Sequence, residues 1–166
     1  YGCSAFNQSV ANFNTAKVTN MTYMFYGCSA FNQSVANFNT AEVTNMAYMF
    51  RGCSAFNQSV ANFNTAKVTD MSSMFRGCIA FKQSLATFIM TLVANVTSML
   101  QGTNINDTGT TTNYDATLVA WAAQDVPNSL NFHGGTSKYS VAGGGTAARA
   151  SLEADDLWTI TDGGQL

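Results

Sequence analysis

The stretch GCSAFNQSVANFNTAKVTNM begins at Gly2, and almost the same stretch begins again at Gly27 and at Gly52. The copies differ only in a lysine or glutamate before the valine and in an asparagine or aspartate before the last methionine. A fixed period of 25 residues is typical of stacked units, each of which packs only against its neighbours. The sequence therefore predicts a repeat protein built from coils of this length.

A fourth, more divergent copy follows at Gly77 and shows which positions must stay apolar. We call residues that lie 25 positions apart a column. Columns in which only apolar residues replace one another predict a continuous core shared between coils. The predicted core ladders are Phe6, Phe31, Phe56 and Phe81; Met21, Met46 and Met71; and Cys3, Cys28, Cys53 and Cys78.

Within one copy, Val18, Met21 and Phe25 recur at three- and four-residue spacing, which predicts a short helix over residues 17–27. Residues 9–14 are short and bounded by polar residues, and they predict a brief strand. One strand and one helix per coil predict an α/β solenoid of leucine-rich-repeat type, with parallel strands on one side. A three-sided β-helix is the alternative, and the three-four spacing disfavours it.

The chain divides into a four-coil solenoid, residues 1–102, and a C-terminal capping region of the same domain, residues 103–166. Ile89, Met90 and Leu92 stand in columns that are polar in the earlier copies. A change from polar to apolar residues in the last coil alone indicates that another part of the chain covers this coil. We therefore expect this stretch to be the docking surface for the capping region.

The capping region repeats the rhythm of a coil without its period. Residues 114–124 and 146–156 have helical patterns, whereas residues 129–132 and the stretch 157–164 each favour a short strand. Helix, strand, helix, strand predicts two degenerate coils, which protect the last hydrophobic layer of the array from water.

Composition excludes several classes of function. Charged residues make up 10% of the chain and its net charge is −2, which gives no basic face for nucleic acid or an anionic membrane. No apolar run approaches the ~18 residues of a membrane-spanning helix, so we expect no membrane insertion within this segment. The chain opens on Tyr1 without a secretion signal, which favours a mature or truncated fragment.

Cys3, Cys28, Cys53 and Cys78 share one column. On the helical side of stacked coils, equivalent atoms would lie ~8–10 Å apart. That exceeds the ~4.4–6.8 Å between Cα atoms that a disulfide tolerates. Ligands spread along a line do not converge on a metal ion either. The column therefore predicts four free, buried thiols.

No catalytic arrangement is visible. His133 is the only histidine, and no nucleophile and acid can be placed beside it. Asp155, Asp156 and Asp162 fit helix-end and turn roles better than a cation site. The stretch NINDTG lacks the dense alternating carboxylates of a calcium loop. We therefore predict no enzyme, no cofactor and no metal.

Asparagines in N-x-Ser/Thr patterns are candidates for glycosylation. The column that ends in Lys82 is predicted to be exposed, because lysine is almost never fully buried. Rows of asparagine also hydrogen-bond along stacked coils, and this alternative stays open. The candidate acceptors are Asn7, Asn32 and Asn57, followed by Asn20, Asn95 and Asn106.

Four tyrosines gather on the first two coils: Tyr1, Tyr23, Tyr26 and Tyr48. Further along the same columns, arginine and serine replace them, so the aromatic residues occupy one end of the array. Because tyrosine is enriched at binding interfaces, this group is the candidate contact surface.

The run FNQSVANFNTAKVTNMTYMFYGCSAF resembles the repeat of BspA-like leucine-rich-repeat surface proteins, whose units end in a similar V-T-N-M-x-x-M-F pattern. The ending KYSVAGGGTAARASLEADDLWTITDGG is similar to the segment that closes such arrays. Phenylalanine in the column of Phe13 and alanine in the column of Ala16 depart from the family's usual tryptophan and serine. The resemblance implies an extracellular or cell-surface protein that serves adhesion or recognition of other surface proteins or glycans.

A structural role is the alternative. The first coil has the sequence of an internal coil, so Phe6, Val10 and Phe13 would lie beside an open edge. A head-to-tail contact that does not close extends into a filament. This alternative predicts that copies of the chain associate with one another through their N-terminal faces.

Overall fold

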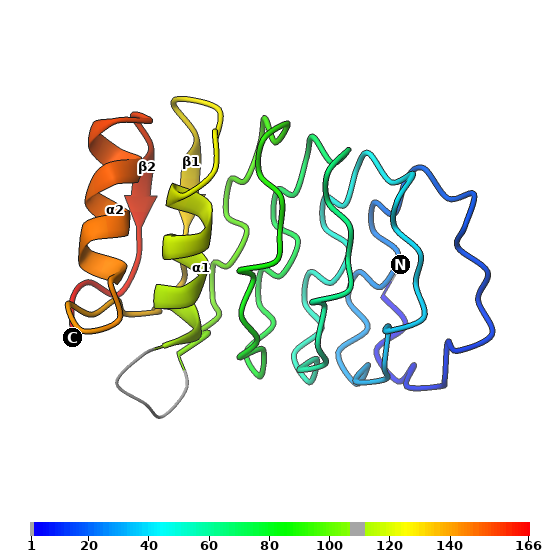
Figure 1. Ribbon diagram of the computed structural model, residues 1–166. Helices are drawn as coiled ribbons and strands as arrows, with labels where there is room; N and C mark the ends of the chain where they lie inside the picture. Colours follow the sequence, from blue (N-terminus) through cyan, green and yellow to red (C-terminus); the bar gives the residue numbers. More distant parts are fainter. Residues whose placement is uncertain (1, 107–111) are drawn as a thin grey trace.

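The computed structural model describes residues 2–106 and 112–166. Successive turns of the chain stack side by side along one axis, and the helices and strands of the capping region stand at the C-terminal end of the stack (Figure 1). Parallel bridges join Asn20 to Asn45, Asn45 to Asp70 and Asp70 to Asn95. Each bridge links residues that are 25 positions apart, so the sequence period is the period of the stack.

Backbone hydrogen bonds between coils are concentrated in residues 20–27 and their equivalents, which we call the ladder segments. The N–H groups of Tyr23, Phe25 and Gly27 donate to the carbonyls of Ala47, Met49 and Arg51 at 3.1, 2.8 and 2.8 Å. The next two interfaces repeat these bonds in the same register. Hydrogen bonds of this kind set neighbouring coils about 4.8 Å apart, as in a β-sheet.

The structure differs from the helix predicted over residues 17–27. Residues 21–28 form three overlapping tight turns, closed by bonds from the N–H groups of Met24, Tyr26 and Cys28 to the carbonyls of Met21, Tyr23 and Phe25. Tyr23, with φ 60°, stands in the left-handed region that such turns require. The three-four spacing of apolar residues is produced by these turns and not by a helix.

The strand predicted over residues 9–14 is also absent from the described coils. A bond from Phe13 N–H to the Val10 carbonyl closes a turn there, at 3.0 Å. The spacing argument against a β-helix depended on the predicted helix, so it no longer holds. The leucine-rich-repeat-like solenoid stays a prediction, while the stacking of coils is directly visible (Figure 1).

Stacked phenylalanines form the centre of the array. Phe25, Phe50 and Phe75 lie 5.4 and 5.6 Å apart between ring centroids, with nearly parallel planes. Phe56 packs 4.2 Å from Phe50, and Phe81 packs 4.3 Å from Phe75. The predicted core ladders are buried in the second, third and fourth coils. The core therefore contains two adjacent columns of rings that run along the stack axis.

The capping region has the two helices and two strands that its sequence predicts. They are α1 (Asn113–Ala122), β1 (Asn131–His133), α2 (Gly145–Ala154) and β2 (Thr159–Thr161). β1 and β2 pair in parallel, and Leu100 N–H of the fourth coil donates to the His133 carbonyl at 3.0 Å. The inter-coil ladder therefore continues from the fourth coil through β1 to β2.

Side chains of α1 and the residues after it bind backbone groups of the fourth coil. Trp121 Nε1 donates to the Leu85 carbonyl at 3.2 Å, and Leu85 N–H donates to Thr117 Oγ1 at 3.0 Å. Gln124 Nε2 donates to the Phe88 carbonyl at 3.0 Å. These bonds fix the helix over the end of the array.

The docking surface predicted at Ile89, Met90 and Leu92 needs correction. Met90 is fully buried, but Ile89 and Leu92 are 38% and 56% exposed. The column of Met90 is buried in every coil, including at Thr65. The change from threonine to methionine in the fourth coil is therefore no evidence that the capping region covers this position. The capping region instead docks through backbone groups of residues 82–90.

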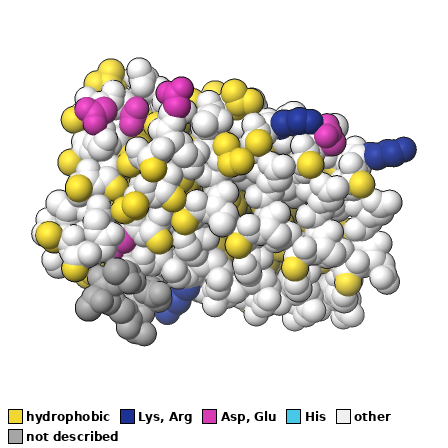
Figure 2. Space-filling model, viewed as in Figure 1, with side chains coloured by type: hydrophobic (Ala, Val, Ile, Leu, Met, Phe, Trp, Pro, Cys, Tyr) yellow, Lys and Arg dark blue, Asp and Glu magenta, His cyan; other side chains and the backbone are white. Residues whose placement is uncertain are grey.

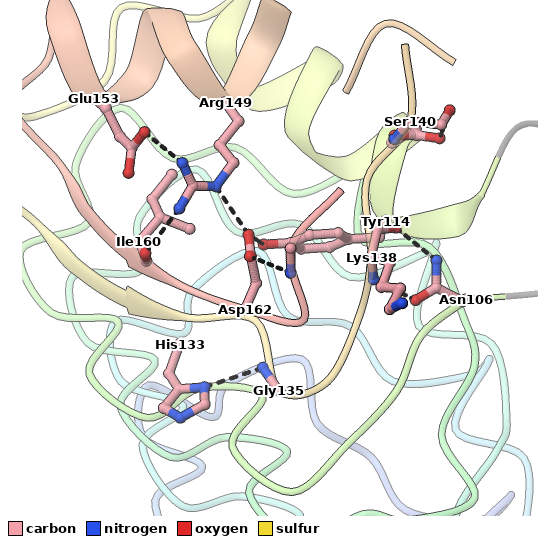
Figure 3. A network of polar contacts seen from close by, with 12 residues as sticks. Asn106, Tyr114, His133, Gly135, Lys138, Ser140, Arg149, Glu153, Ile160 and Asp162 are labelled. Atoms are coloured by element: carbon pink, nitrogen blue, oxygen red, sulfur yellow. Dashed lines mark hydrogen bonds and ion pairs between the residues drawn. The ribbon is translucent and has the colours of Figure 1, made fainter. Parts of the chain in front are cut away.

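A partly buried ionic network closes the C-terminal end (Figure 3). The carboxylate of Asp162 accepts hydrogen bonds from Tyr114 OH at 2.9 Å and from Arg149 Nε at 3.0 Å. Arg149 Nη2 also donates to the Ile160 carbonyl at 3.0 Å, and the guanidinium pairs with Glu153. The central carbonyl of β2 is thus occupied by a side chain of α2, which blunts the edge of the last strand.

Candidate recognition surface

The outward side chains of the ladder segments, β1 and β2 form a surface that we call the ladder face. One column of this face is Tyr23, Tyr48, Ser73 and Ser98, with φ between 53° and 60° throughout. Left-handed backbone is costly for residues other than glycine, by about 1–2 kcal/mol each. Because the inter-coil bonds impose the same turn in every coil, the column accepts tyrosine and serine alike.

Three tyrosines and one arginine come together at the N-terminal end of the ladder face. Tyr23 and Tyr48 stack with centroids 4.7 Å apart, and Tyr26 meets Tyr23 edge-on at 5.6 Å. The guanidinium carbon of Arg51 lies 5.6 Å from the Tyr26 centroid and 5.5 Å from that of Tyr48. We call these four residues the tyrosine cluster; Tyr1, the fourth predicted tyrosine, lies outside the described residues.

The tyrosine cluster joins flat aromatic surfaces to polar groups on a rigid backbone. All four side chains are partly exposed, so a ligand can reach them. Cation–π contacts hold Arg51 against the rings and leave guanidinium N–H groups for hydrogen bonding. Tyrosine supplies a large contact area with few rotatable bonds. Arg51 was missed in the sequence because it was treated only as the arginine that replaces tyrosine in the column of Tyr26.

The other end of the ladder face contains a shallow hollow of about 180 Å³. Its lining residues are Thr97, Ser98, Asn131, Phe132, His133, Thr159 and Thr161. We call it the hydroxyl hollow. Sequence reasoning gave no sign of it, because its residues come from three separate segments that only the pairing of β1 with β2 and the fourth coil brings together.

The asparagine column of the first glycosylation candidates forms a hydrogen-bonded row. Asn7 Oδ1 accepts from Asn32 N–H at 2.9 Å and from Gln33 Nε2 at 3.0 Å. Asn32 and Asn57 repeat this pattern toward the next coil. These asparagines therefore hydrogen-bond along the stacked coils, as the alternative to glycosylation predicts. Their Oδ1 atoms join the coils while the side chains stay on the accessible surface.

The remaining acceptor candidates also have structural roles. Asn20 and Asn95 lie on the ladder, where each Oδ1 accepts from the N–H group two residues later. Asn106 is bound on both sides of its amide by Lys138, since Nδ2 donates to the Lys138 carbonyl and Oδ1 accepts its N–H. Figure 3 shows this pair. Because its Nδ2 atom is already hydrogen-bonded, Asn106 is the least favourable of the six candidates for attachment of a glycan.

The prediction for the cysteine column needs two corrections. Cys28, Cys53 and Cys78 are buried free thiols, but Cys3 is exposed. The predicted helix-packing distance between the cysteines was also wrong, because the coils lie at β-sheet spacing. Cys53 Sγ and Cys78 Sγ donate to backbone carbonyls of the preceding coils, both at 2.9 Å. Each of these two thiols therefore helps to bind adjacent coils.

Burial of the thiols predicts alkaline destabilisation. Desolvation, and secondarily the charge of Cys28, raises the pKa of Cys53 from 9.0 to about 12. A raised folded-state pKa favours the neutral thiol, so this stability is complete below pH 9 and is lost as the pH rises toward about 12. The free energy of unfolding should fall by about 1.4 kcal/mol per pH unit for this group.

Urea denaturation between about pH 8 and about pH 11 tests this prediction. Cys53→Ala should show a shallower decline with pH than the unchanged protein. Cys28 and Cys78, whose pKa values desolvation also raises, and Tyr114 keep part of the decline in the variant. Equal slopes for the variant and the unchanged protein would contradict the assignment.

Charged side chains are few, and neutral groups dominate the face seen in Figure 2. Glu42 and Lys67, which belong to adjacent coils, form an ion pair with Nζ 2.8 Å from Oε2. Both side chains are more than half exposed, so the pair contributes little, about 0–1 kcal/mol.

The residues first weighed for catalysis or metal binding lie apart. His133 Nδ1 accepts from Gly135 N–H at 3.1 Å, and Asp155 accepts from Ser151 Oγ at the end of α2. Asp156 accepts Ser129 N–H through its backbone carbonyl. Among the described residues no three histidine, cysteine or acidic side chains are grouped as metal ligands would be. In the same part of the chain, no helix has the length and apolar character needed to cross a membrane.

Comparison with known proteins places the repeats in a known family. A family model described as "Mycoplasma protein of unknown function, DUF285" matches residues 1–114, which include all four coils. Neither the curated proteins nor the solved structures contain a significant match. Since the matched span is more than half of the chain, the protein belongs to the family described as Mycoplasma protein of unknown function, DUF285.

Proposed function

We propose that this protein is a non-enzymatic, extracellular surface module for adhesion or recognition, and that the tyrosine cluster is its contact surface. The resemblance of its repeats to those of BspA-like leucine-rich-repeat surface proteins supports this function. Partners of this class are other surface proteins or glycans.

The observation that carries the proposal is the stack of Tyr23 on Tyr48 beside Tyr26 and Arg51. Tyrosine and arginine are the residues most enriched at the energetic centres of interfaces. Here they stand on backbone that hydrogen bonds hold in register, so little conformational entropy is lost on binding. A partly exposed aromatic group outside the core is well placed to contact a ligand.

The test introduces residues that already occur at equivalent positions of other coils. Tyr23→Ser combined with Tyr48→Ser converts the column to the residue present at Ser73 and Ser98, with the same backbone angle. The matched control is Ile79→Ser, because Ile79 is an exposed large side chain whose column holds serine in the other coils. Binding is measured by surface plasmon resonance against a panel of purified extracellular-matrix proteins and glycans.

We expect the double variant to bind at least about tenfold more weakly, a loss of about 1.4 kcal/mol, while Ile79→Ser binds normally. Thermal unfolding must show that the double variant is folded. Unchanged affinity in the double variant, or no binding partner in the whole panel, would refute the proposal.

Head-to-tail assembly into an extracellular filament is the second candidate. Its support is the exposed N-terminal face: Phe13 is 47% exposed, whereas Phe38 in the same column is 3% exposed. However, Arg149 occupies the Ile160 carbonyl at the opposite end, where a second copy would have to pair. Sedimentation velocity at increasing protein concentration distinguishes filament assembly from recognition. Only filament assembly predicts a series of oligomers whose size grows with concentration.

A further inference from the structure

We propose that the hydroxyl hollow binds a neutral saccharide. This inference rests on the proposed recognition function and deepens it, because it names the ligand class and a second contact site. The hollow and the tyrosine cluster lie on the same ladder face, since Ser98 and Tyr48 belong to one column.

The shape of the hollow follows from the register of the strands. Asn131 pairs with Thr159 and His133 pairs with Thr161, so the outward side chains of β1 and β2 stand in two short rows. Phe132 lies between the outward residues of β1 and also lines the hollow, while its ring is buried in the core. Thr97 and Ser98 of the fourth coil form the third row. Polar groups therefore surround the depression from three adjacent segments.

These polar groups are free to bind a ligand. Within the described part of the chain, no hydrogen bond engages the hydroxyl of Ser98, Thr159 or Thr161, or the amide of Asn131. His133 Nδ1 accepts from Gly135, which leaves the proton on Nε2 (Figure 3). The hollow therefore offers hydroxyls that both donate and accept, an amide that does both, and one ring N–H donor.

The absence of charge in this lining selects the ligand class. No lysine, arginine, aspartate or glutamate is among the residues that line the hollow. An anion would need a basic partner, and a cation would need carboxylates. A protein ligand would need an apolar centre to bury, but the outward residues here are polar. Neutral molecules rich in hydroxyl groups can both donate hydrogen bonds to these polar side chains and accept hydrogen bonds from them.

The tyrosine cluster extends this site. Two coil steps separate Tyr48 from Ser98, which at sheet spacing is about 10 Å. A chain of sugar units lying along the stack axis can place one unit in the hollow. A later unit then reaches the aromatic rings, against which the apolar face of a sugar packs. The inferred ligand is thus an oligosaccharide longer than the hollow itself.

The experiment screens the whole chain on an array of neutral, sialylated and sulfated glycans, followed by titration calorimetry with the tightest neutral glycan. Thr159→Val with Thr161→Val removes two hydroxyls at nearly constant shape. Ser98→Tyr fills the hollow with the residue that the same column holds at Tyr48. Thr87→Val is the control, because Thr87 is an exposed threonine in a turn outside the lining.

We expect binding to neutral glycans, weakened at least about tenfold by each hollow variant and unchanged by Thr87→Val. Binding to acidic glycans alone, to no glycan, or equally by the unchanged protein and the hollow variants would overturn the inference. If protein ligands still bind and Tyr23→Ser with Tyr48→Ser abolishes that binding, the recognition function stands and only the saccharide site fails.

Discussion

Replacing Phe63 with alanine is expected to lower the free energy of unfolding by about 3–5 kcal/mol, whereas Phe13→Ala should cost about 1 kcal/mol or less. The two residues share a column and a local sequence. Phe63 is 2% exposed because coils lie on both sides of it, but Phe13 is 47% exposed and stacks only on Phe38. The difference between the two losses of unfolding free energy measures how much one covering coil contributes to stability at this column.

Urea denaturation at neutral pH gives both values in one experiment. Phe38→Ala, at 3% exposure, provides the internal check and should behave like Phe63→Ala. A cost at position 13 as large as that at position 63 would mean that the first coil is covered in solution. That outcome would favour self-association, and the dependence of the cost on protein concentration would then identify it.

Removing the carboxylate of Asp115 is expected to cost about 3–5 kcal/mol. Asp115 is 1% exposed and completes the capping box of α1 with Thr112. Its oxygens accept Ser140 N–H and Ser140 Oγ, both at 2.7 Å, so they also tie α1 to the loop before α2. Asp115→Ala removes the acceptor from three buried hydrogen bonds, and the loss of each costs about 1–3 kcal/mol.

Asp125→Ala is the matched control, since Asp125 is exposed and should change stability by no more than about 0.5 kcal/mol. Chemical denaturation followed by tryptophan fluorescence reports the loss directly, because Trp121 and Trp158 lie in the capping region. Equal stability of the two variants would show that solvent replaces the lost hydrogen bonds and that the network does not hold the cap.

The period of the sequence predicts the stacking register, because identical residues make identical interfaces. The core ladders follow from it directly, as does the burial of Phe56 and Met46. The turn that replaces the expected helix could not be read from spacing alone. Apolar residues at Met21 and Phe25 face inward either way, and only the inter-coil hydrogen bonds distinguish the two backbones.

The candidate site was only partly predictable for a similar reason. Tyr23 and Tyr48 stand out because their column changes to serine, and a departure within a repeat is visible in sequence. The hydroxyl hollow has no such signal, since Ser98, His133 and Thr161 meet only after the capping region has docked. Likewise, the exposure of Cys3 depends on what lies beside the first coil and not on its own residues.

The uniform interface between coils also bears on how such a gene can change. Gly27, Gly52 and Gly77 each meet the same residue of the coil before, and the same backbone groups bond at every step. An in-frame duplication of one repeat therefore inserts a unit whose two faces already fit their neighbours. An insertion of any other length would misalign every later column. The distance between the tyrosine cluster and the hydroxyl hollow can thus be lengthened in steps of about 4.8 Å by copying alone.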